Sequence, residues 1–350
     1  MAKLNKKNIY NPETKETLNQ RLVFGGDPDG TLNFTRMKFD WALRVWDIME
    51  KNTWFPKEVQ MTQDAKDYKN LTPAEKRMYD LVLSQLIFMD SLQTNNIMDN
   101  INPYITAPEI NACLSRQSYE EANHSKSYAV MVESISDNTD LIYNMWKTDK
   151  VLLEKNKFIA YVYQQLAGDV TDEKLLLALF ANQILEGIYF YSGFAALYSL
   201  AKSGKMLGSS QMIKFIQRDE VTHLLLFQNM INSVRETRPE LFTKELKEKV
   251  LEMFDLAVQY ETNWGKYITQ NNILGFTDAI IDDYIRYLAD QRLVAVGFEK
   301  RYNRKNPISW VDAFSSFDDQ KTNFFEGNAM NYSKASVEMN DDDFGDFDLK

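Results

Sequence analysis

The stretch Glu121-Ala-Asn-His124-Ser-Lys-Ser-Tyr128 decides the fold class, because its Glu-x-x-His pattern returns later as Glu220-Val-Thr-His223. These are the only two histidines in the 350-residue chain. Both patterns lie in long segments of periodic apolar residues without Pro or Gly, which predicts helices. Positions three apart share a helix face, so each helix presents a carboxylate and an imidazole at one place.

Two such helices that face each other supply most of the ligands of a dinuclear metal site in a ferritin-like bundle. A site of this kind takes one further carboxylate from each of two other helices. Because burying an unpaired charge is costly, each carboxylate should stand alone in an apolar stretch. Asp90 in Leu86-Ile-Phe-Met-Asp90-Ser-Leu92 and Glu186 in Ile184-Leu-Glu186-Gly-Ile fit this description.

The sequence therefore predicts an all-α, ferritin-like helical bundle with extra helices and six residues that hold two metal ions. The six are Asp90, Glu121, His124, Glu186, Glu220 and His223. Four carboxylates with two imidazoles favour neither soft metals nor Ca²⁺. Iron and manganese both suit this set of ligands.

Composition excludes several classes of function. A net charge of −10 without a basic stripe argues against a nucleic-acid partner. Cys113 is the only cysteine, which excludes a disulfide framework and a thiolate metal site. Residues 1–7 have no apolar core of the kind found in a signal peptide.

Residues 175–201 are apolar enough to be mistaken for a membrane span. Asn182, Gln183 and Glu186 in the middle of this run would be costly in lipid. A helix that is apolar on all sides and lies at the centre of a bundle explains the run better. We therefore expect a soluble, cytoplasmic protein without a membrane segment.

One large helical domain is expected, because no linker separates the residues between Asp90 and His223. The predicted division is an N-terminal arm over 1–33, a ferritin-like metal-binding domain over 34–305 and a flexible tail over 306–350. Thr72-Pro73-Ala-Glu75 has the pattern of a capping box with proline at the first helical position, and Thr106-Ala-Pro108-Glu109 is similar. Further helices are expected at about 34–51, 151–166, 173–202, 209–235, 243–269 and 277–302, with an extended piece at 52–56.

The chain ends in the acidic sequence Asn340-Asp-Asp-Asp-Phe344-Gly-Asp-Phe347-Asp-Leu349-Lys350. A segment of this composition cannot bury enough surface to fold alone. It is either a plain disordered tail or a peptide that docks on a partner through Phe344, Phe347 and Leu349.

Tyr128 lies one helical turn after His124 and two turns after Glu121, on the face that carries the ligands. Phe190 and Phe194 follow Glu186 at helical spacing, and Ile216 precedes Glu220 by four residues. These three residues would form an apolar wall near the metals. Tyr128 is either an ordinary core tyrosine or a redox-active phenol in this water-poor pocket.

Together, the six predicted ligands, Tyr128 and the apolar residues near it resemble the site of the small, radical-generating subunit of class I ribonucleotide reductase. The similarity runs from about Trp54 to the end of the chain. Its motifs are Met89-Asp90-Ser91, Glu121-x-x-His124-x-x-x-Tyr128, Leu185-Glu186 with Phe190 and Phe194, and Arg218-Asp219-Glu220-x-x-His223. The resemblance implies a dinuclear centre, with two iron ions per chain as the first expectation and manganese as the other. This centre would react with oxygen and oxidise Tyr128.

The resemblance also implies partners and a path for the radical. Trp54 would be an internal relay, and Asp219 would link His124 to it. Tyr332 and Glu326 match an interface tyrosine and an acidic residue that supports proton movement there. The tail would dock on a large catalytic subunit, which reduces ribonucleoside diphosphates to deoxyribonucleotides. A homodimer is implied, and a flavoprotein activase is left open.

Three alternative functions do not require all of these residues. A ferritin-like metal-storage protein needs neither Tyr128, Trp54 nor the tail. A related di-metal oxidase would need space for a small substrate near the metals, where Phe190 and Phe194 stand. A metal-free structural bundle ranks last, because it would bury six ionisable groups without compensation.

Overall fold

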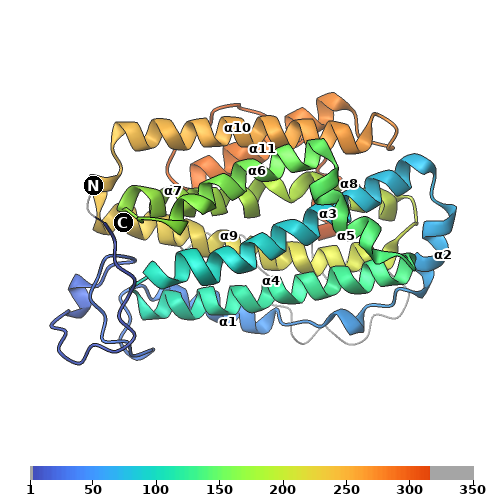
Figure 1. Cartoon of the computed structure of the whole chain (residues 1–350). Helices are drawn as coiled ribbons and strands as arrows, with labels where there is room; N and C mark the ends of the chain where they lie inside the picture. Colours follow the sequence, from blue (N-terminus) through green and yellow to red (C-terminus); the bar gives the residue numbers. More distant parts are fainter. Residues whose placement is uncertain (1–2, 316–350) are drawn as a thin grey trace.

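The computed structural model describes residues 3–315, and within this range the chain is all-α. The described residues form three isolated β-bridges and no strand. Figure 1 shows long helices that run side by side along one axis. The predicted all-α bundle is thus confirmed. Glu326, Tyr332 and residues 316–350 of the proposed docking tail lie outside the described residues.

Helices of three kinds make up the regular structure of the described chain. The α-helices are α1 (Trp41–Lys51), α2 (Thr62–Asn70), α3 (Pro73–Asn96), α4 (Pro108–Ile135), α5 (Thr139–Thr148), α6 (Lys150–Gln164), α7 (Asp172–Ile184), α8 (Tyr191–Lys202), α9 (Leu207–Thr237), α10 (Lys244–Thr269), α11 (Asp278–Ala295) and α12 (Trp310–Ser315). Two π-helices, η3 (Ile97–Ile101) and η6 (Leu185–Tyr189), and the short 3₁₀ turns η1 (Leu18–Gln20), η2 (Pro56–Glu58), η4 (Asn102–Tyr104), η5 (Gln165–Ala167) and η7 (Pro239–Leu241) lie between them or before α1.

The core of the bundle is made by α3, α4, α9 and the run α7–η6–α8. α3 packs against α4 and α8, while α9 packs against α4, α7 and α8. α1 covers α4 and α9, and α10 covers α3, α6, α7 and α8 (Figure 1). Every residue from 178 to 201 is buried, so this run is enclosed on all sides.

The start of α3 matches its sequence pattern. Thr72 Oγ1 accepts a hydrogen bond from the Glu75 backbone N–H at 3.2 Å, and the Glu75 carboxylate accepts from the Thr72 N–H at 2.8 Å. This reciprocal pair is the predicted capping box, with Pro73 at the first helical position. The cap fixes where α3 begins, and the packing of α3 against its neighbours buries Asp90.

The first predicted helix begins later than expected, at Trp41 instead of residue 34. The Glu109 carboxylate accepts hydrogen bonds from the backbone N–H groups of Lys38 and Phe39, both at 3.0 Å. These long-range bonds hold the chain in a non-helical path before α1. Local periodicity could not reveal a partner on another helix.

The capping of α4 and the end of α11 also differ from the prediction. α4 begins at Pro108 as expected, but Thr106 does not cap it, because its hydroxyl bonds to Gly26 N and Leu22 O instead. α11 ends at Ala295, seven residues early, because Gly297 adopts φ of 78° and closes a Schellman turn.

The apolar run Asp172–Lys202 is the one stretch of the described chain that is long and apolar enough to cross a membrane. However, 94% of its apolar window is buried inside the bundle. The run is therefore a core helix of a soluble protein, as the polar residues in its middle predicted.

The N-terminal segment lies at one end of the bundle and bonds to it through its backbone (Figure 1). Leu4 N–H donates to Val170 O, Lys7 N–H donates to Pro103 O, and Thr106 N–H donates to Val23 O, each at 2.8 Å. Its contacts therefore lie near the start of α4 and the loop before α7. The proposed division at residue 33 remains a prediction.

The N-terminus of α9 is capped by side chains from α2. The Asp64 carboxylate accepts hydrogen bonds from Gly208 N at 2.9 Å and from Ser209 N at 2.6 Å. Asp67 accepts from the N–H of Met206, which has a left-handed φ of 54°. Negative charge at a helix N-terminus is stabilising, so α2 helps to anchor the helix that carries Glu220 and His223.

Candidate metal centre

Six buried side chains meet at the centre of the bundle in two overlapping groups. One group is Asp90, Glu121, His124 and Glu220, and the other is Glu121, Glu186, Glu220 and His223. Within each group the potential ligand atoms lie within 4.8 Å of one another. Glu121 and Glu220 belong to both groups, so each of them could contribute to holding either ion. The structure thus brings together all six residues that the sequence singled out.

Each ligand candidate comes from an element whose position depends on the bundle. α3 presents Asp90, and α4 presents both residues of the first Glu-x-x-His pattern. α9 presents the second pattern, and the π-helix η6 presents Glu186. The prediction of one continuous helix around Glu186 was wrong in this detail, since residues 185–189 form a wider turn between α7 and α8.

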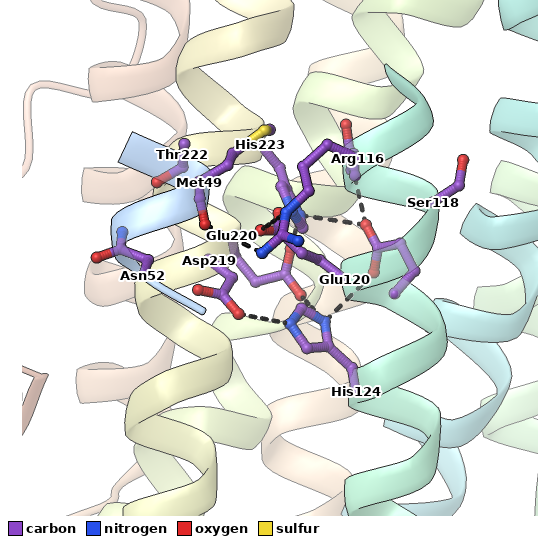
Figure 2. Close-up of polar contacts among 12 residues, drawn as sticks. Met49, Asn52, Arg116, Ser118, Glu120, His124, Asp219, Glu220, Thr222 and His223 are labelled. Carbon is purple, nitrogen blue, oxygen red and sulfur yellow. Dashed lines mark hydrogen bonds and ion pairs between the residues drawn. The ribbon is translucent and has the colours of Figure 1, made fainter. Parts of the chain in front are cut away.

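His124 is oriented by carboxylates at both ring nitrogens. Its Nδ1 lies 3.4 Å from Glu121 Oε2 and 3.2 Å from Glu220 Oε1. Its Nε2 lies 3.1 Å from Asp219 Oδ2 (Figure 2). A proton on Nε2 donated to Asp219 leaves the Nδ1 lone pair free for a metal, which is the usual arrangement for ligating histidines.

His223 has the same arrangement, with a partner that sequence reasoning missed. Its Nδ1 lies 2.8 Å from Glu220 Oε2 and 3.2 Å from Glu121 Oε1. Its Nε2 lies 2.9 Å from Glu120 Oε2 (Figure 2). Glu120 therefore holds this imidazole with Nδ1 turned toward the cluster.

The two carboxylates that bond to the Nε2 atoms of the histidines, here called the outer carboxylates, occupy equivalent positions in the sequence. Asp219 directly precedes the ligand candidate Glu220, and Glu120 directly precedes Glu121. Each of these acids bonds to the histidine on the opposite helix, so the two motifs are linked crosswise. Glu120 could have been found from this repeated acid before the Glu-x-x-His pattern.

Two arginines hold the outer carboxylates. Arg116 Nε donates to Glu120 Oε1 at 2.9 Å, and its Nη2 donates to Thr53 Oγ1 at 2.7 Å. Arg218 Nε lies 3.6 Å from Asp219 Oδ1, and its Nη2 donates to the backbone carbonyl of Asn52. The segment before Trp54 is thereby tied to both sides of the site.

Amide side chains hold Glu186. Gln117 Nε2 donates to Glu186 Oε1 at 2.9 Å and to Glu121 Oε1 at 3.0 Å. Gln93 Nε2 also donates to Glu186 Oε1. Glu186 Oε2, in contrast, is buried and has no hydrogen-bond partner among the described residues.

Burial and mutual repulsion perturb the titration of these groups. Burial, followed by the negative charges of Glu121 and Glu220, raises the pKa of Asp90 well above its usual value. Burial and the same two charges raise the pKa of Glu186 in the same way. Burial alone would lower the pKa of His124, but Glu220 and the other acids outweigh it and raise this pKa well above the usual value.

The site fits a pair of divalent cations. Several buried ligand atoms have no hydrogen-bond partner among the described residues, namely both Asp90 oxygens, Glu121 Oε2, His124 Nδ1, Glu186 Oε2 and Glu220 Oε1. Buried polar atoms are almost always satisfied, so a group of free acceptors that converge on one place indicates an ion. Four carboxylates balance the charge of two divalent ions.

Tyr128 is fully buried on α4, one turn after His124. Burial and then the charge of Asp90 raise the pKa of Tyr128 well above its usual value. Phe190, Phe194 and Ile216 are fully buried as well, and the rings of the two phenylalanines stack with centroids 5.7 Å apart. Their role as a wall around Tyr128 remains a prediction.

Trp54 joins the site through Asp219. Its indole Nε1–H donates to Asp219 Oδ2 at 2.7 Å, and the same oxygen bonds to His124. Trp54 is 2% exposed and stacks on Phe215, with ring centroids 5.2 Å apart. The three side chains Trp54, Asp219 and His124 therefore form one continuous hydrogen-bonded chain toward the cluster.

These features define a ferritin-like bundle protein with a buried dinuclear carboxylate–histidine metal centre. The family model described as "Ribonucleotide reductase, small chain" matches residues 31–307. The chain belongs to this family, as the resemblance predicted. It is an oxidoreductase subunit, and as a small chain it works together with a large subunit.

Individual relatives agree over nearly the whole chain. The ribonucleoside-diphosphate reductase subunit beta of Treponema pallidum is 39% identical over 345 residues, covering 97% of this chain and 98% of that protein. The ribonucleotide reductase R2 subunit from Clostridium botulinum has 38% identity and a TM-score of 0.86, covering 90% of this chain and 100% of that one. The dimanganese(II)-NrdF of Streptococcus sanguinis shares the fold, with a TM-score of 0.71 at 20% identity over 82% of this chain and 99% of that one. Family membership disfavours the storage, oxidase and metal-free alternatives.

The Glu120→Ala variant tests the crosswise link. Without Glu120, the imidazole of His223 loses its outer partner, so we expect metal affinity to fall by about 10-fold to 100-fold. Mn(II) is titrated into metal-free protein, and the electron paramagnetic resonance signal of free Mn(II) reports how much remains unbound. Glu133→Ala, at an exposed position on the same helix, is the matched control and should bind as the unchanged chain does. Unaltered binding by Glu120→Ala would contradict the role of Glu120.

Proposed function

We propose that this chain generates the radical of a ribonucleoside-diphosphate reductase and holds it on Tyr128. Asp90, Glu121, His124, Glu186, Glu220 and His223 would hold the two metal ions. The observation that carries the proposal is the hydrogen-bonded chain from Trp54 through Asp219 to His124, next to a fully buried tyrosine on the ligand-bearing helix. When bound, the metal pair would supply oxygen activation and the oxidising power for one-electron chemistry.

Tyr128 is the residue that would be oxidised. Its phenol would give one electron to the oxidised metal pair, when that pair is bound, and the proton of Oη to a base at the site, which leaves a neutral tyrosyl radical. Asp90 is the charged group that acts most strongly on this phenol. Complete burial keeps water and small reductants away, which favours a long-lived radical.

Trp54 would relay the oxidising equivalent between this site and the surface, and Asp219 would link its indole to His124. Because Asp219 accepts hydrogen bonds from both the indole and the imidazole, a change of charge on one ring alters the hydrogen bond to the other ring. Tyr332 and Glu326, by resemblance, would continue the path at the interface with the large subunit. Both lie outside the described residues.

Iron and manganese are both candidates for the metal. Carboxylate and imidazole ligands suit either ion. The family resemblance makes iron our first choice, and the Streptococcus sanguinis protein, which shares the fold, is named as a dimanganese(II) form. We further propose a cytoplasmic homodimer, with a flavoprotein activase as a candidate additional partner.

Electron paramagnetic resonance tests the role of Tyr128. Metal-free protein is loaded with Fe(II) or with Mn(II) and exposed to oxygen, beside the Tyr128→Phe variant. We expect a tyrosyl signal in the unchanged chain and its complete loss in Tyr128→Phe, with metal content unaltered. His124→Ala is the control that should lose metal as well.

Two other results would change the proposal. A coupled mixed-valent metal signal without any tyrosyl signal would mean that the metals store the oxidant. Fully oxidised metal with neither signal would favour an oxidase or storage function.

The Trp54→Phe variant tests the relay. Phenylalanine keeps an aromatic ring but cannot donate a hydrogen bond to Asp219. Reductase activity with the large subunit should therefore fall about 100-fold or more, since even a small displacement of a group that takes part in a reaction can cost about 100-fold in rate. Metal content and the Tyr128 radical should remain. Trp41→Phe is the matched control for Trp54→Phe, because Trp41 is also buried and its Nε1 donates to Ser233 on α9 at 3.1 Å. Equal activity of the two variants would exclude Trp54 from the path.

Deletion of residues 333–350 tests the docking role of the tail. Because Phe344, Phe347 and Leu349 would be lost, we expect no binding to the large subunit, while metal content and the radical persist. Binding is measured by analytical ultracentrifugation of the mixed subunits. Retained binding would show that docking uses another surface.

A further inference from the structure

The helix that carries Glu186 is interrupted where this residue lies. α7 ends at Ile184, α8 begins at Tyr191, and the five residues of η6 between them form a π-turn. A π-turn accommodates an extra residue in the helix, and such turns occur frequently at functional sites. Since each residue advances an α-helix by about 100°, loss of the extra residue would rotate Glu186 by about that angle relative to α7 or α8.

Side chains from other helices bind the backbone at this interruption. The Tyr189 carbonyl accepts from Gln85 Nε2 at 2.5 Å and from Lys155 Nζ at 3.0 Å. The Ser192 N–H donates to Glu261 Oε1 at 3.2 Å. These partners come from α3, α6 and α10, so three neighbouring helices hold the π-turn.

A fourth helix reaches the turn at Gly187. Its carbonyl accepts from Arg292 Nε of α11 at 3.2 Å. A Cβ on Gly187 would lie 2.9 Å from Arg292 Cγ, so a larger residue would displace the arginine. The close approach of α11 therefore depends on glycine at this position.

Lys155 and Glu261 form a buried ion pair beside the turn. Lys155 Nζ lies 2.5 Å from Glu261 Oε2, and the two side chains are 1% and 0% exposed. Apolar residues of similar volume often stabilise a core as well as a buried ion pair does. The distinguishing property of this pair is that the ammonium bonds to a carbonyl and the carboxylate to an N–H of the same interruption, which apolar residues cannot do.

We propose that Lys155 and Glu261 are positioning residues that hold the π-turn and thereby aim the Glu186 carboxylate at the metal centre. Lys155 binds the end of the turn, and Glu261 binds the first turn of α8. The inference rests on the proposed ligand set, because it takes Glu186 to be a ligand.

The test is the double variant Lys155→Met/Glu261→Met in the full chain, which leaves neither charge buried alone. We expect the thermal unfolding midpoint to change little, because the benefit of replacing buried charges with apolar side chains is offset by the loss of two buried hydrogen bonds to the backbone. The amides of residues 185–193 should exchange hydrogen about 10-fold faster or more, because the turn loses its partners. In Mn(II) titrations followed by electron paramagnetic resonance, one of the two ions should bind about 10-fold more weakly or worse.

Two variants serve as controls. Arg238→Met/Asp172→Met removes another ion pair, 2.8 Å long, between the start of α7 and the residue after α9, and should leave exchange and Mn(II) binding unchanged. Lys155→Met/Glu261→Gln also leaves no charge buried but keeps an oxygen for the Ser192 N–H, so its amide exchange and Mn(II) affinity should lie between those of the double methionine variant and those of the unchanged chain.

Unchanged amide exchange together with two equally tight Mn(II) ions in Lys155→Met/Glu261→Met would overturn the inference. If the unchanged chain itself fails to bind two Mn(II) ions, the proposed ligand set is wrong. The exchange comparison would then still decide whether the ion pair holds the π-turn.

Discussion

The structure depends on the burial of four carboxylates and two imidazoles at one place inside a helical bundle. Unpaired buried charge is strongly unfavourable, so each member must be oriented by partners or by a bound cation. In this bundle, amide, carboxylate and arginine side chains around the site form the hydrogen bonds and ion pairs that orient the six residues. The ligand atoms left unsatisfied converge on the space between α3, α4, α9 and η6, where two cations would be stabilised most.

The outer partners give the site a near two-fold pattern. Each Glu-x-x-His motif carries an acid before its glutamate, and each acid bonds to the histidine of the other motif. The symmetry is broken in one respect that matters for function. On one side Asp219 also binds the indole of Trp54, whereas on the other side Glu120 binds Arg116. Only the first arrangement offers a redox-active ring as an extension of the site.

The helix around Glu186 shows how the fold supports this chemistry. A π-turn is less stable than regular helix and persists only where its surroundings compensate for it. In this bundle the compensation comes from Gln85, Lys155, Glu261 and Arg292, on four separate helices. One short segment of backbone thus connects Glu186, a proposed ligand, with the packing of the outer helices.

The sequence by itself determined the fold class and the six converging residues. These follow from helical periodicity and from isolated acids in apolar runs, which are local properties, whereas the link from Trp54 to Asp219 was implied only by the family resemblance. Tertiary structure alone decided the start of α1 and the π-turn at Glu186, and it alone showed that Glu120, which the repeated acid marks only as a candidate, pairs with His223. Each of these depends on a hydrogen-bond partner far away in the chain, and no local pattern states which distant group a side chain will meet.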